Sequence, residues 1–456
     1  MKRREFLKRA AVTAAATGPF LGSVRGANDR VVVGQIGCGA RGYYELTICQ
    51  RNPNVRVAAV CDVYKPLVDR AVRLTEGQAE GYGDFRRILD RKDIDAVFVS
   101  TPDHWHAIPT ILACQAGKDV YCEKPLTHTI EEGRRMVEAA RKHKRVVQTG
   151  CQQRSAPHFA KIVELIRGGY IGNVALVEAW NVGNESPEGI GKPPDSPPPE
   201  GLDWDLYLGP APKAPYNRNR FIWNYRWFWD YSGGMMTDWG AHHMDIVHWA
   251  MGVDAPGSAL AAGGIFCLQD NRETPDTLTT VFEYPGFQAR YTNRMTSAFP
   301  LVRGYGMLFY GDRGALFVDR GSYEVYPDMR AEGARGDVDR IQELLRSGQP
   351  AAAPSPPRPQ PKPLCEAIKE AGFRLDPPVQ EAHVQNFVDC VRSRQRPVAD
   401  VEIGHRVVTA CHLGVIAYRT GRKIRWDAKQ EKIVGDPEAQ RMTSKQYRAP
   451  WVLPKV

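Results

Sequence analysis

The stretch that decides the fold of this chain is Val31-Val32-Val33-Gly34-Gln35-Ile36-Gly37-Cys38-Gly39-Ala40-Arg41-Gly42. Its apolar first half predicts a buried parallel strand, and the Gly-x-Gly-x-x-Gly pattern that follows predicts a tight turn into a helix. In such a turn the first glycine allows the bend, the second lets a pyrophosphate approach the backbone, and the third lets the helix pack on the strand. We therefore expect a dinucleotide here, held by Gly37, Gly39, Ala40, Arg41 and Gly42.

A second strand ends in an acidic residue where the ribose of a dinucleotide is expected. The run Val57-Ala58-Ala59-Val60-Cys61 precedes Asp62, which lies 20 residues after Gly42. A carboxylate there accepts hydrogen bonds from the ribose hydroxyls and repels a 2′-phosphate. Asp62 thus favours NAD over NADP, a preference that the neighbouring Lys65 would moderate. The alternative interpretation is a surface acid at the end of a strand.

Strands and helices then alternate up to about residue 150. Strands are expected at 95–100, 120–122 and 146–149, and helices at 108–116 and 133–143. The second helix is preceded by Thr129-Ile130-Glu131-Glu132, which has the form of a capping box. Because repeated β-α alternation is typical of a doubly wound parallel sheet, we expect an α/β Rossmann domain over residues 30–150.

The first 27 residues have the composition of an export signal. A charged start, Met1-Lys2-Arg3-Arg4-Glu5-Phe6-Leu7-Lys8, precedes an apolar run that ends near Phe20-Leu21-Gly22. This order resembles a twin-arginine signal peptide, and the alternative is a basic N-terminus without a targeting role. We expect a periplasmic or otherwise exported protein, with no membrane insertion after removal of the signal.

Net charge and cysteine content argue against several other classes. The formal net charge is +9, but residues 1–27 contribute +5 of it, and the rest of the chain has no basic patch of the kind that nucleic-acid binding needs. The ten cysteines are scattered without a Cys-x-x-Cys pair, which favours free core thiols over a disulfide framework or a zinc site. We expect neither a nucleic acid nor a metal ion as a partner.

Three clusters of residues together carry a resemblance to a known family. They are the glycine turn with Asp62, then Thr101-Pro102-Asp103-His104-Trp105-His106 with Glu123-Lys124-Pro125, and last Gly233-Gly234-Met235-Met236-Thr237-Asp238-Trp239-Gly240-Ala241-His242-His243-Met244-Asp245. In order and spacing they resemble the glucose–fructose oxidoreductase/inositol dehydrogenase family, also called Gfo/Idh/MocA. The resemblance covers most of the chain from about residue 30. It implies NAD-dependent oxidation of a secondary hydroxyl on a sugar, glycoside or cyclitol.

The resemblance implies roles for the middle cluster. Lys124 would polarise or deprotonate the reacting hydroxyl beside the nicotinamide. Thr101, Pro102, Glu123 and Lys124 itself would contact the cofactor, and His106 would line the same cleft.

The last cluster supplies the implied substrate side. Asp238 and His242 are four residues apart, so on a helix they share one face and would point at one substrate. His242 would act as general base or proton relay, Asp238 would hold a second hydroxyl, and Asp245 would orient His242. Histidine and carboxylate at this spacing also suit a metal ion. We favour the family pattern, which accounts for these residues without a metal.

Residues 151–456 are expected to form an α+β domain with a large, mostly antiparallel sheet and C-terminal helices at 381–394 and 403–419. By the resemblance, one open face of this sheet would support a homo-oligomer, either a dimer or a tetramer. Arg154 and Arg226 are implied substrate contacts. The neighbouring Tyr225 stands where the family often has tryptophan, which weakens the case for a direct role.

Two segments of this second domain have unusual compositions. Residues 184–231 are rich in proline and in aromatic side chains, whose faces suit sugar rings; for most of them we favour packing of a long loop. Residues 330–363 are rich in proline and alanine and predict a surface insertion or linker. The basic run 419–425 predicts a solvated turn.

Three functions remain open at this point. The first is an exported oxidoreductase whose cofactor is bound tightly and recycled by a second substrate, because the periplasm offers no nicotinamide pool. The second is a redox-neutral, NAD-dependent glycosidase or epimerase that acts through a transient keto-sugar. The third is a sugar-binding protein on an inactive scaffold, which the presence of both Lys124 and His242 disfavours. Fold alone does not decide among them.

Overall fold

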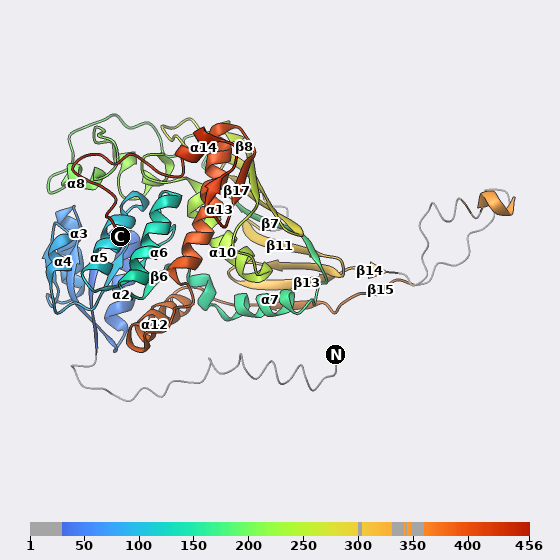
Figure 1. Ribbon diagram of the computed structural model, residues 1–456, viewed down its shortest axis with the longest axis horizontal. Coiled ribbons are helices and arrows are strands. Elements are labelled where there is room, and N and C mark those ends of the chain that lie inside the picture. Colours follow the sequence, from blue (N-terminus) through green and yellow to red (C-terminus); the bar gives the residue numbers. More distant parts are fainter. Residues whose placement is uncertain (1–29, 300–302, 331–341, 343, 349–359) are drawn as a thin grey trace. The chain divides into compact units, whose positions relative to one another are not determined.

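The computed structural model describes residues 30–299, 303–330, 342, 344–348 and 360–456. The expected twin-arginine segment, residues 1–27, lies outside this range, as does most of the Pro/Ala-rich stretch 330–363. Figure 1 shows the arrangement of the elements within Val31–Val456, which form one unit.

The N-terminal half is built on a six-stranded, entirely parallel sheet with the order β3-β2-β1-β4-β5-β6. Its strands are β1 Val31–Ile36, β2 Val55–Cys61, β3 Glu80–Tyr82, β4 Ala96–Val99, β5 Asp119–Cys122 and β6 Val147–Thr149. Its helices are α2 Ala40–Arg51, α3 Lys65–Leu74, α4 Arg86–Asp90, α5 Ala107–Gln115 and α6 Ile130–Lys142. The strand order reverses between β1 and β4, and the expected doubly wound Rossmann sheet is confirmed.

Local sequence signals explain where these elements begin. The side chain of Thr129 accepts a hydrogen bond from the backbone of Glu132, whose own carboxylate accepts from the backbone of Thr129, so the predicted capping box opens α6. The strands β1, β2, β4 and β5 are buried along almost their whole length. Such continuous burial is what a parallel sheet covered by helices on both faces requires.

The second half is built on a ten-stranded sheet with the order β16-β13-β12-β11-β7-β10-β9-β8-β17-β18. Its strands are β7 Val174–Val182, β8 Ser258–Gly264, β9 Thr277–Tyr284, β10 Phe287–Arg294, β11 Tyr305–Gly311, β12 Gly314–Val318, β13 Ser322–Pro327, β16 Ile368–Ala371, β17 Ile424–Asp427 and β18 Lys432–Ile433. Only β7 and β10 are parallel neighbours. The mostly antiparallel sheet expected for this half is therefore confirmed.

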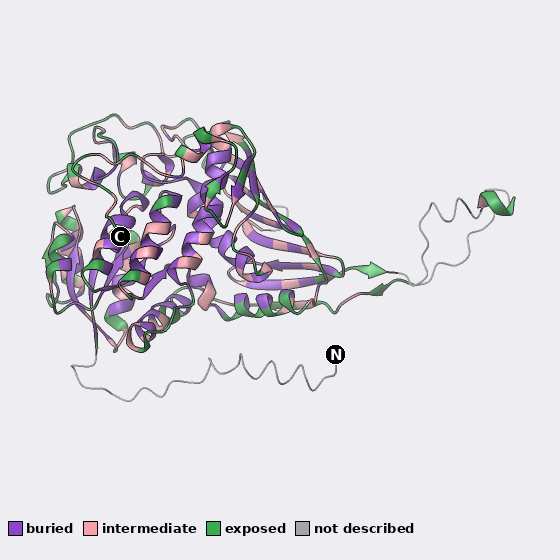
Figure 2. Ribbon diagram, in the orientation of Figure 1, coloured by how far each residue is buried: buried purple, intermediate pink, exposed green. Residues whose placement is uncertain are grey.

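Three helices cover one face of this sheet and join it to the Rossmann half: α7 Pro157–Arg167, α10 Gly240–Met251 and α13 Val401–Thr420. The longest of them, α13, packs against both α6 and β8, and α10 packs against α7 and α13. Figure 2 shows buried residues in both sheets and on these helices, with exposed residues among them, as along α7. Among the described residues, no helix is both long and apolar enough to cross a bilayer.

The C-terminal part of the chain returns to the Rossmann half. Helix α12, Pro378–Ser393, contributes Val384, Phe387 and Val388 to the core around β1 and β4. The ring of Phe387 meets that of Phe98 edge to face at 5.6 Å. The expected division at residue 151 therefore does not separate the two packed cores, because α12 completes the first of them. The basic run 419–425 spans the end of α13, an exposed turn and the start of β17, which pairs with β8 of the second sheet.

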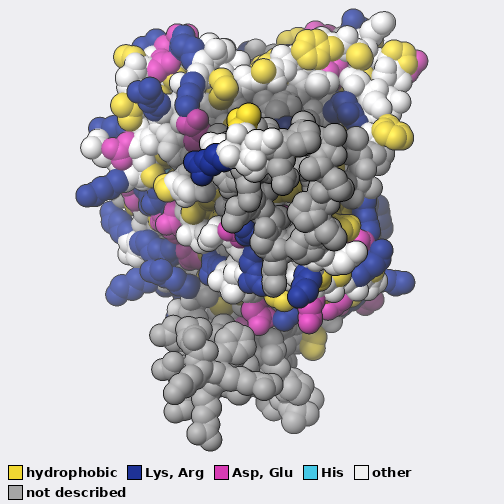
Figure 3. All heavy atoms as spheres, turned by 90° about the vertical axis from the view of Figure 1, so that its right-hand side faces the viewer, with side chains coloured by type: hydrophobic (Ala, Val, Ile, Leu, Met, Phe, Trp, Pro, Cys, Tyr) yellow, Lys and Arg dark blue, Asp and Glu magenta, His cyan; other side chains and the backbone are white. Residues whose placement is uncertain are grey.

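The remaining short elements lie near the surface or at the site. They are α8 Trp204–Leu208, α9 Met235–Asp238, α14 Pro437–Arg441 and the pair β14 Met329–Arg330 and β15 Lys362–Pro363. On the face drawn in Figure 3, Lys and Arg side chains occur on both sides of the molecule with Asp and Glu among them. All ten cysteines are free thiols.

Candidate active site

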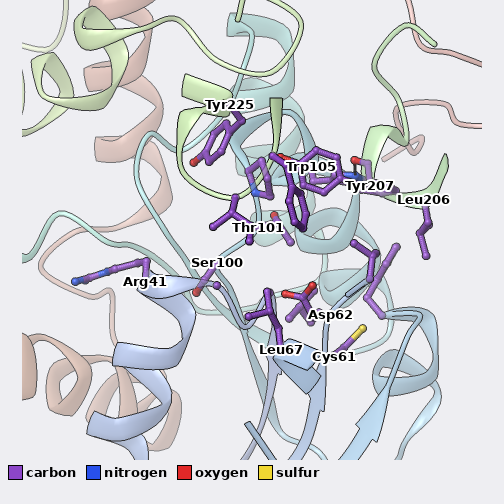
Figure 4. Close-up of a pocket in the computed structure, with 18 of the residues that line it drawn as sticks. Arg41, Cys61, Asp62, Leu67, Ser100, Thr101, Trp105, Leu206, Tyr207 and Tyr225 are labelled. Carbon is purple, nitrogen blue, oxygen red and sulfur yellow. Dashed lines mark hydrogen bonds between the residues drawn. The ribbon is translucent and has the colours of Figure 1, made fainter. Parts of the chain in front are cut away.

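A cavity of about 960 Å³, including its open mouth, lies at the carboxyl edge of the Rossmann sheet. It occupies the switch between β1 and β4, where open α/β sheets bind their ligands. The Rossmann side of the cavity includes Gly37, Gly39, Ala40, Arg41, Asp62, Thr101 and Pro102, all predicted from the sequence. Figure 4 shows Tyr207 and Tyr225, from residues 184–231, across the cavity from Asp62 and Leu67.

The three glycines of the turn meet three different steric demands. Gly37 has φ +88°, and a Cβ on it would lie 2.7 Å from the backbone of Ser100. A Cβ on Gly42 would lie 2.0 Å from the carbonyl oxygen of Gly37, so only glycine lets the helix sit this close. A Cβ on Gly39 would meet nothing within 4 Å, and Gly39 lines the cavity. That free space is where a pyrophosphate would approach the backbone, so the turn fits a dinucleotide.

Asp62 is held at the end of β2 by two backbone N–H groups. Cys38 donates to one carboxylate oxygen at 2.7 Å and Tyr64 to the other at 3.0 Å. Burial raises the pKa of Asp62 to about 6, against the opposing effect of these donors. Lys65 pairs with the exposed Asp69 at 2.7 Å and is not part of the cavity lining. Asp62 is thus placed to bind ribose hydroxyls. Lys65 does not offer its charge to a 2′-phosphate, because it is engaged with Asp69.

A buried ion pair connects the glycine turn to the Glu-Lys-Pro segment. Arg41 donates to one carboxylate oxygen of Glu123 at 2.9 Å, and the backbone N–H of Lys124 donates to the other at 3.0 Å. Although burial opposes it, Arg41 holds the pKa of Glu123 below its ordinary value. Burial and the charge of Glu123 raise the pKa of the neighbouring Glu45. The Glu45 carboxylate accepts a hydrogen bond from the Ser100 hydroxyl. Glu123 therefore fixes the backbone that carries Lys124.

Lys124 reaches across to the second half of the chain. Its Nζ lies 2.5 Å from Asp238 Oδ1 and donates to the Asp238 carbonyl at 3.1 Å. Asp238 also faces Arg226 Nε at 3.5 Å. Burial opposes ionisation of Asp238, but the two cations lower its pKa to about 2. Because an ammonium group has three donors, one N–H of Lys124 is left for a ligand.

His242 lies beside this pair. The helix expected to carry both residues is interrupted at Trp239, between α9 and α10, yet Lys124 still acts electrostatically on both Asp238 and His242. No described residue makes a hydrogen bond to either nitrogen of the His242 ring, and its Nδ1 is buried. Burial, and then the charges of Lys124 and Arg320, hold the pKa of His242 well below its ordinary value. The imidazole is therefore neutral at neutral pH and able to accept a proton.

Two predicted site residues act as supports instead of facing the cavity. His106 is buried, and its two ring nitrogens face the carbonyl oxygens of Pro125 and Thr101, each at 2.8 Å. It therefore braces the Glu-Lys-Pro segment against β4. Arg154 pairs with Asp245 at 2.6 Å, so this acid holds Arg154 and does not orient His242.

Tyr225 has a larger part in the site than its departure from the family pattern suggested. It lines the cavity, and its hydroxyl donates to Asp103 at 3.1 Å. Asp103 also accepts from the Ser232 hydroxyl at 2.5 Å. The guanidinium of the neighbouring Arg226 lies 4.3 Å from the centre of the Trp223 ring. Asp103 stood inside a quoted motif, but nothing in the sequence indicated that it would meet Tyr225.

Residues 184–231, here called the covering loop, close the cavity from above. The backbone of Lys65 donates to Gly201 and that of Asp203 to Val63, both at 2.9 Å, so the loop is anchored beyond the end of β2. The indole of Trp105 donates to the carbonyl of Tyr207 at 2.9 Å. Many of the loop's aromatic rings pack together, as favoured from the sequence. Four of the loop's rings also line the cavity: Tyr207, Phe221, Trp223 and Tyr225.

The last residues of the chain, 445–456, lie over the covering loop and are here called the C-terminal strap. Arg448 donates to the carbonyls of Gly209, Ala211 and Asp205 at 2.9, 3.1 and 2.8 Å. Lys445 and Tyr447 hold the strap to Glu132 of α6, at 2.8 and 2.5 Å. The loop that covers the cavity is itself held in place from outside.

The described residues contain no group of three or more His, Cys, Asp or Glu side chains arranged to hold a metal ion. The carboxylates near Lys124 are instead engaged with arginine and lysine: Asp238 with Lys124 and Arg226, Glu123 with Arg41, and Asp245 with Arg154.

Comparison with known proteins places this geometry in a family. A model described as "Oxidoreductase family, NAD-binding Rossmann fold" matches residues 31–151, and one described as "Oxidoreductase family, C-terminal alpha/beta domain" matches 188–260 and 370–453. The chain belongs to the Gfo/Idh/MocA family. The second match includes both the covering loop from residue 188 and the strap up to residue 453.

Individual relatives match over part of their length. The chain is 37% identical to an inositol 2-dehydrogenase of Klebsiella pneumoniae over 142 residues, which are 31% of this chain and 42% of the relative. It is 32% identical to a glycosyl hydrolase family 109 protein of a Shewanella species over 163 residues, 33% of this chain and 35% of the relative. The chain thus spans less than half the length of these curated relatives.

Solved structures share the fold over a larger range. The WlbA dehydrogenase of Bordetella pertussis, crystallised with NADH and UDP-GlcNAcA, superposes with a TM-score of 0.61 at 18% identity. The likeness covers 87% of this chain and 99% of that one. At this level of identity the comparison establishes the fold, and the chemistry has to be argued from the site.

Proposed function

We propose that this family member is an NAD-dependent oxidoreductase that acts on a secondary hydroxyl of a sugar, glycoside or cyclitol and keeps its cofactor bound through turnover. The observation that carries the proposal is the meeting of Lys124, Asp238 and the neutral His242 next to the dinucleotide cavity. Arg226 belongs both to the cavity lining and to this group, so the two regions are continuous.

The residues divide the chemistry of alcohol oxidation between them. Lys124, held by Asp238, donates its remaining N–H to the oxygen of the reacting hydroxyl and stabilises the charge that develops there. His242, neutral and without a competing hydrogen bond, accepts the hydroxyl proton. Asp238 and Arg226 contact neighbouring hydroxyls and fix the pose. When bound, NAD supplies the hydride acceptor, and Asp62, Gly39 and Thr101 are the residues that would hold it.

The covering loop and the strap support cofactor retention. The loop lines the cavity from residue 206 to residue 226, and the strap binds its outer side through Arg448. If the loop must open before a dinucleotide leaves, these contacts slow its release. Retention suits an enzyme that oxidises one substrate and reduces another on the same cofactor. It equally suits the redox-neutral glycosidase or epimerase alternative, which the experiment below separates.

We also propose export by the twin-arginine route. The proposal rests on the Arg3-Arg4 pair followed by Phe6-Leu7-Lys8 and an apolar run. Replacing both arginines with lysine should leave the protein in the cytoplasm, as measured by cell fractionation. Unchanged fractionation would contradict the proposal.

A homo-oligomer, dimer or tetramer, is proposed through the outer face of the ten-stranded sheet. The opposite face is covered by α7, α10 and α13, whereas outward residues of the sheet include Leu260 and Tyr326, with 49% and 46% of their surface exposed. A second copy of this chain would cover these apolar side chains, because antiparallel sheets that face solvent usually carry polar residues at such outward positions. Leu260→Glu should then shift the mass measured by light scattering to that of a monomer.

The test of the catalytic proposal starts with protein purified without added cofactor. The nucleotide released on denaturation is identified, and the intact protein is then mixed with sugars, glycosides and cyclitols. We expect near-ultraviolet absorbance from a bound reduced nicotinamide to appear. Adding a second substrate that carries a carbonyl group should then oxidise the nicotinamide and remove this absorbance. Cleavage or inversion of a glycoside without net reduction would favour the redox-neutral alternative. Substrate binding without either reaction would favour the third alternative, a sugar-binding protein on an inactive scaffold.

A further inference from the structure

Arg320 is a half-buried cation beside the active site that the chemistry above does not use. It lies in the turn between β12 and β13, and its guanidinium lies 4.5 Å from the centre of the Trp239 ring. The same indole meets the His242 ring at 5.8 Å. The Nε of Arg320 donates to Gln153 Oε1 at 3.3 Å, and the backbone N–H of Arg320 donates to the Tyr305 hydroxyl. The charge of Arg320 is close enough to lower the pKa of His242.

Among the described residues, Arg320 has no carboxylate at ion-pair distance. The other cations around the site are all paired: Arg41 with Glu123, Arg154 with Asp245, and both Lys124 and Arg226 with Asp238. On the substrate side, Lys124 and Arg226 thus share a single carboxylate, and Arg320 adds a positive charge that no ion pair balances. Burial lowers the pKa of Arg320 from its ordinary value, which reflects the cost of a partly buried charge without a counter-ion.

We propose that Arg320 binds an anionic group of the substrate, so that the substrate is an acidic sugar carrying a carboxylate or a phosphate. The free edge of the guanidinium offers paired N–H donors, whose planar geometry matches either group. The indole of Trp239 holds the guanidinium plane, which fixes the direction of these donors. The anion would balance the excess charge on the substrate side. This inference rests on the proposed function, because it assigns the substrate class of the same site.

The experiment measures binding separately from turnover. The protein, as purified with its nucleotide, is titrated calorimetrically with three matched probes: glucose, glucuronate and glucose 6-phosphate. We expect at least one anionic probe to bind about tenfold or more tighter than glucose, the order expected for a charge-assisted bidentate pair. The carboxylate and phosphate probes then distinguish the two sources of the anion.

Three variants sharpen the test. Arg320→Met should remove the preference for the anionic probe by about tenfold or more while leaving glucose within about twofold. Arg320→Lys, which keeps the charge but loses the fork, should fall between the two. The control is Arg422→Met, because Arg422 pairs with Asp436 and Glu438 at the surface. Arg320→Met should also raise the pKa of His242, seen as a shift of the acid limb of the pH–rate profile.

The outcomes separate this inference from the function on which it rests. Equal affinity for neutral and anionic probes, no binding of any anionic probe, or an equal loss of all probes in Arg320→Met would overturn the role of Arg320 even if sugars are oxidised. An Arg320-dependent preference for the anion supports the inference. If this preference is observed but no sugar reduces the bound nicotinamide, the proposed oxidation is wrong and the anion site at Arg320 is still supported.

Discussion

Truncation of Arg448 tests whether the strap holds the covering loop over the cofactor. In the folded protein its side chain donates to the carbonyls of Asp205, Gly209 and Ala211, and it pairs with the Asp205 carboxylate at 2.6 Å. Arg448→Ala removes all of these contacts and keeps the backbone bond to Pro210 at 3.0 Å. The loop would then keep this backbone bond and its contacts with the rest of the fold, but lose the side-chain contacts from the strap.

The magnitude follows from the exposure of the partners. The Asp205 side chain is 69% exposed, so its ion pair contributes little and is left out. Arg448 makes hydrogen bonds to three carbonyls, and two of these bonds share its Nε. At roughly 1 kcal/mol each, they contribute about 2–3 kcal/mol to holding the loop closed. If the loop must open before the dinucleotide leaves, this loss speeds release by roughly 30- to 140-fold.

Release is measured by mixing the purified protein with excess isotopically labelled NAD and following exchange after rapid desalting. The matched control is Arg422→Ala, because Arg422 binds Asp436 and Glu438 at the surface and does not contact the loop. The reasoning is refuted if Arg448→Ala exchanges its nucleotide at the wild-type rate. It is also refuted if Arg422→Ala accelerates exchange equally.

Two further predictions concern charged groups of the site. NAD release should accelerate as the pH falls through about 6, because protonation of Asp62 removes its charge and weakens it as an acceptor for the ribose hydroxyls. Asp62→Asn should abolish this pH dependence in the same exchange assay. Asp238 has a pKa of about 2 in place of 3.8, which contributes about 2 kcal/mol of stability above pH 4 that is lost as the pH falls toward 2. Asp238→Asn should therefore lower the free energy of unfolding at neutral pH by at least this amount, since it leaves Lys124 and Arg226 without a counter-ion. Denaturant titrations measure this free energy, and equal stability of the two proteins at neutral pH would contradict the role of the ion pair.

The sequence was most informative where chemistry and local geometry coincide. The glycine turn and the capping box at Thr129 depend mainly on residues within a few positions of one another, and their local geometry is as expected. Asp62 lies at the end of β2 as expected, although one of the N–H groups that hold it comes from Cys38, 24 residues earlier in the chain. The pairing of Lys124 with Asp238 spans 114 residues. Only the family resemblance brought them together, because neither residue has a local partner that periodicity reveals.

What the sequence did not reveal are contacts between distant surfaces. Helix α12 was expected from its apolar pattern, but an amphipathic pattern does not name the surface it covers, and the helix packs on the Rossmann core. Arg320 lies in a short turn with no motif around it, and its place beside Trp239 follows from the register of β12 and β13. Arg448 likewise gave no signal, because its partners are backbone carbonyls more than 200 residues away.

The most direct test of the central claim is a single-turnover reduction of the bound nucleotide in wild type and Lys124→Met. Both proteins are loaded with NAD, checked for equal nucleotide content, and mixed with the sugar that reduces the wild type. Because Gly39, Asp62 and Thr101, which would hold most of the nucleotide, are unchanged, we predict equal NAD content and a fall of about 10²-fold or more in the rate at which reduced nicotinamide forms. Equal rates in the two proteins would contradict the assignment of Lys124, Asp238 and His242 as the active site.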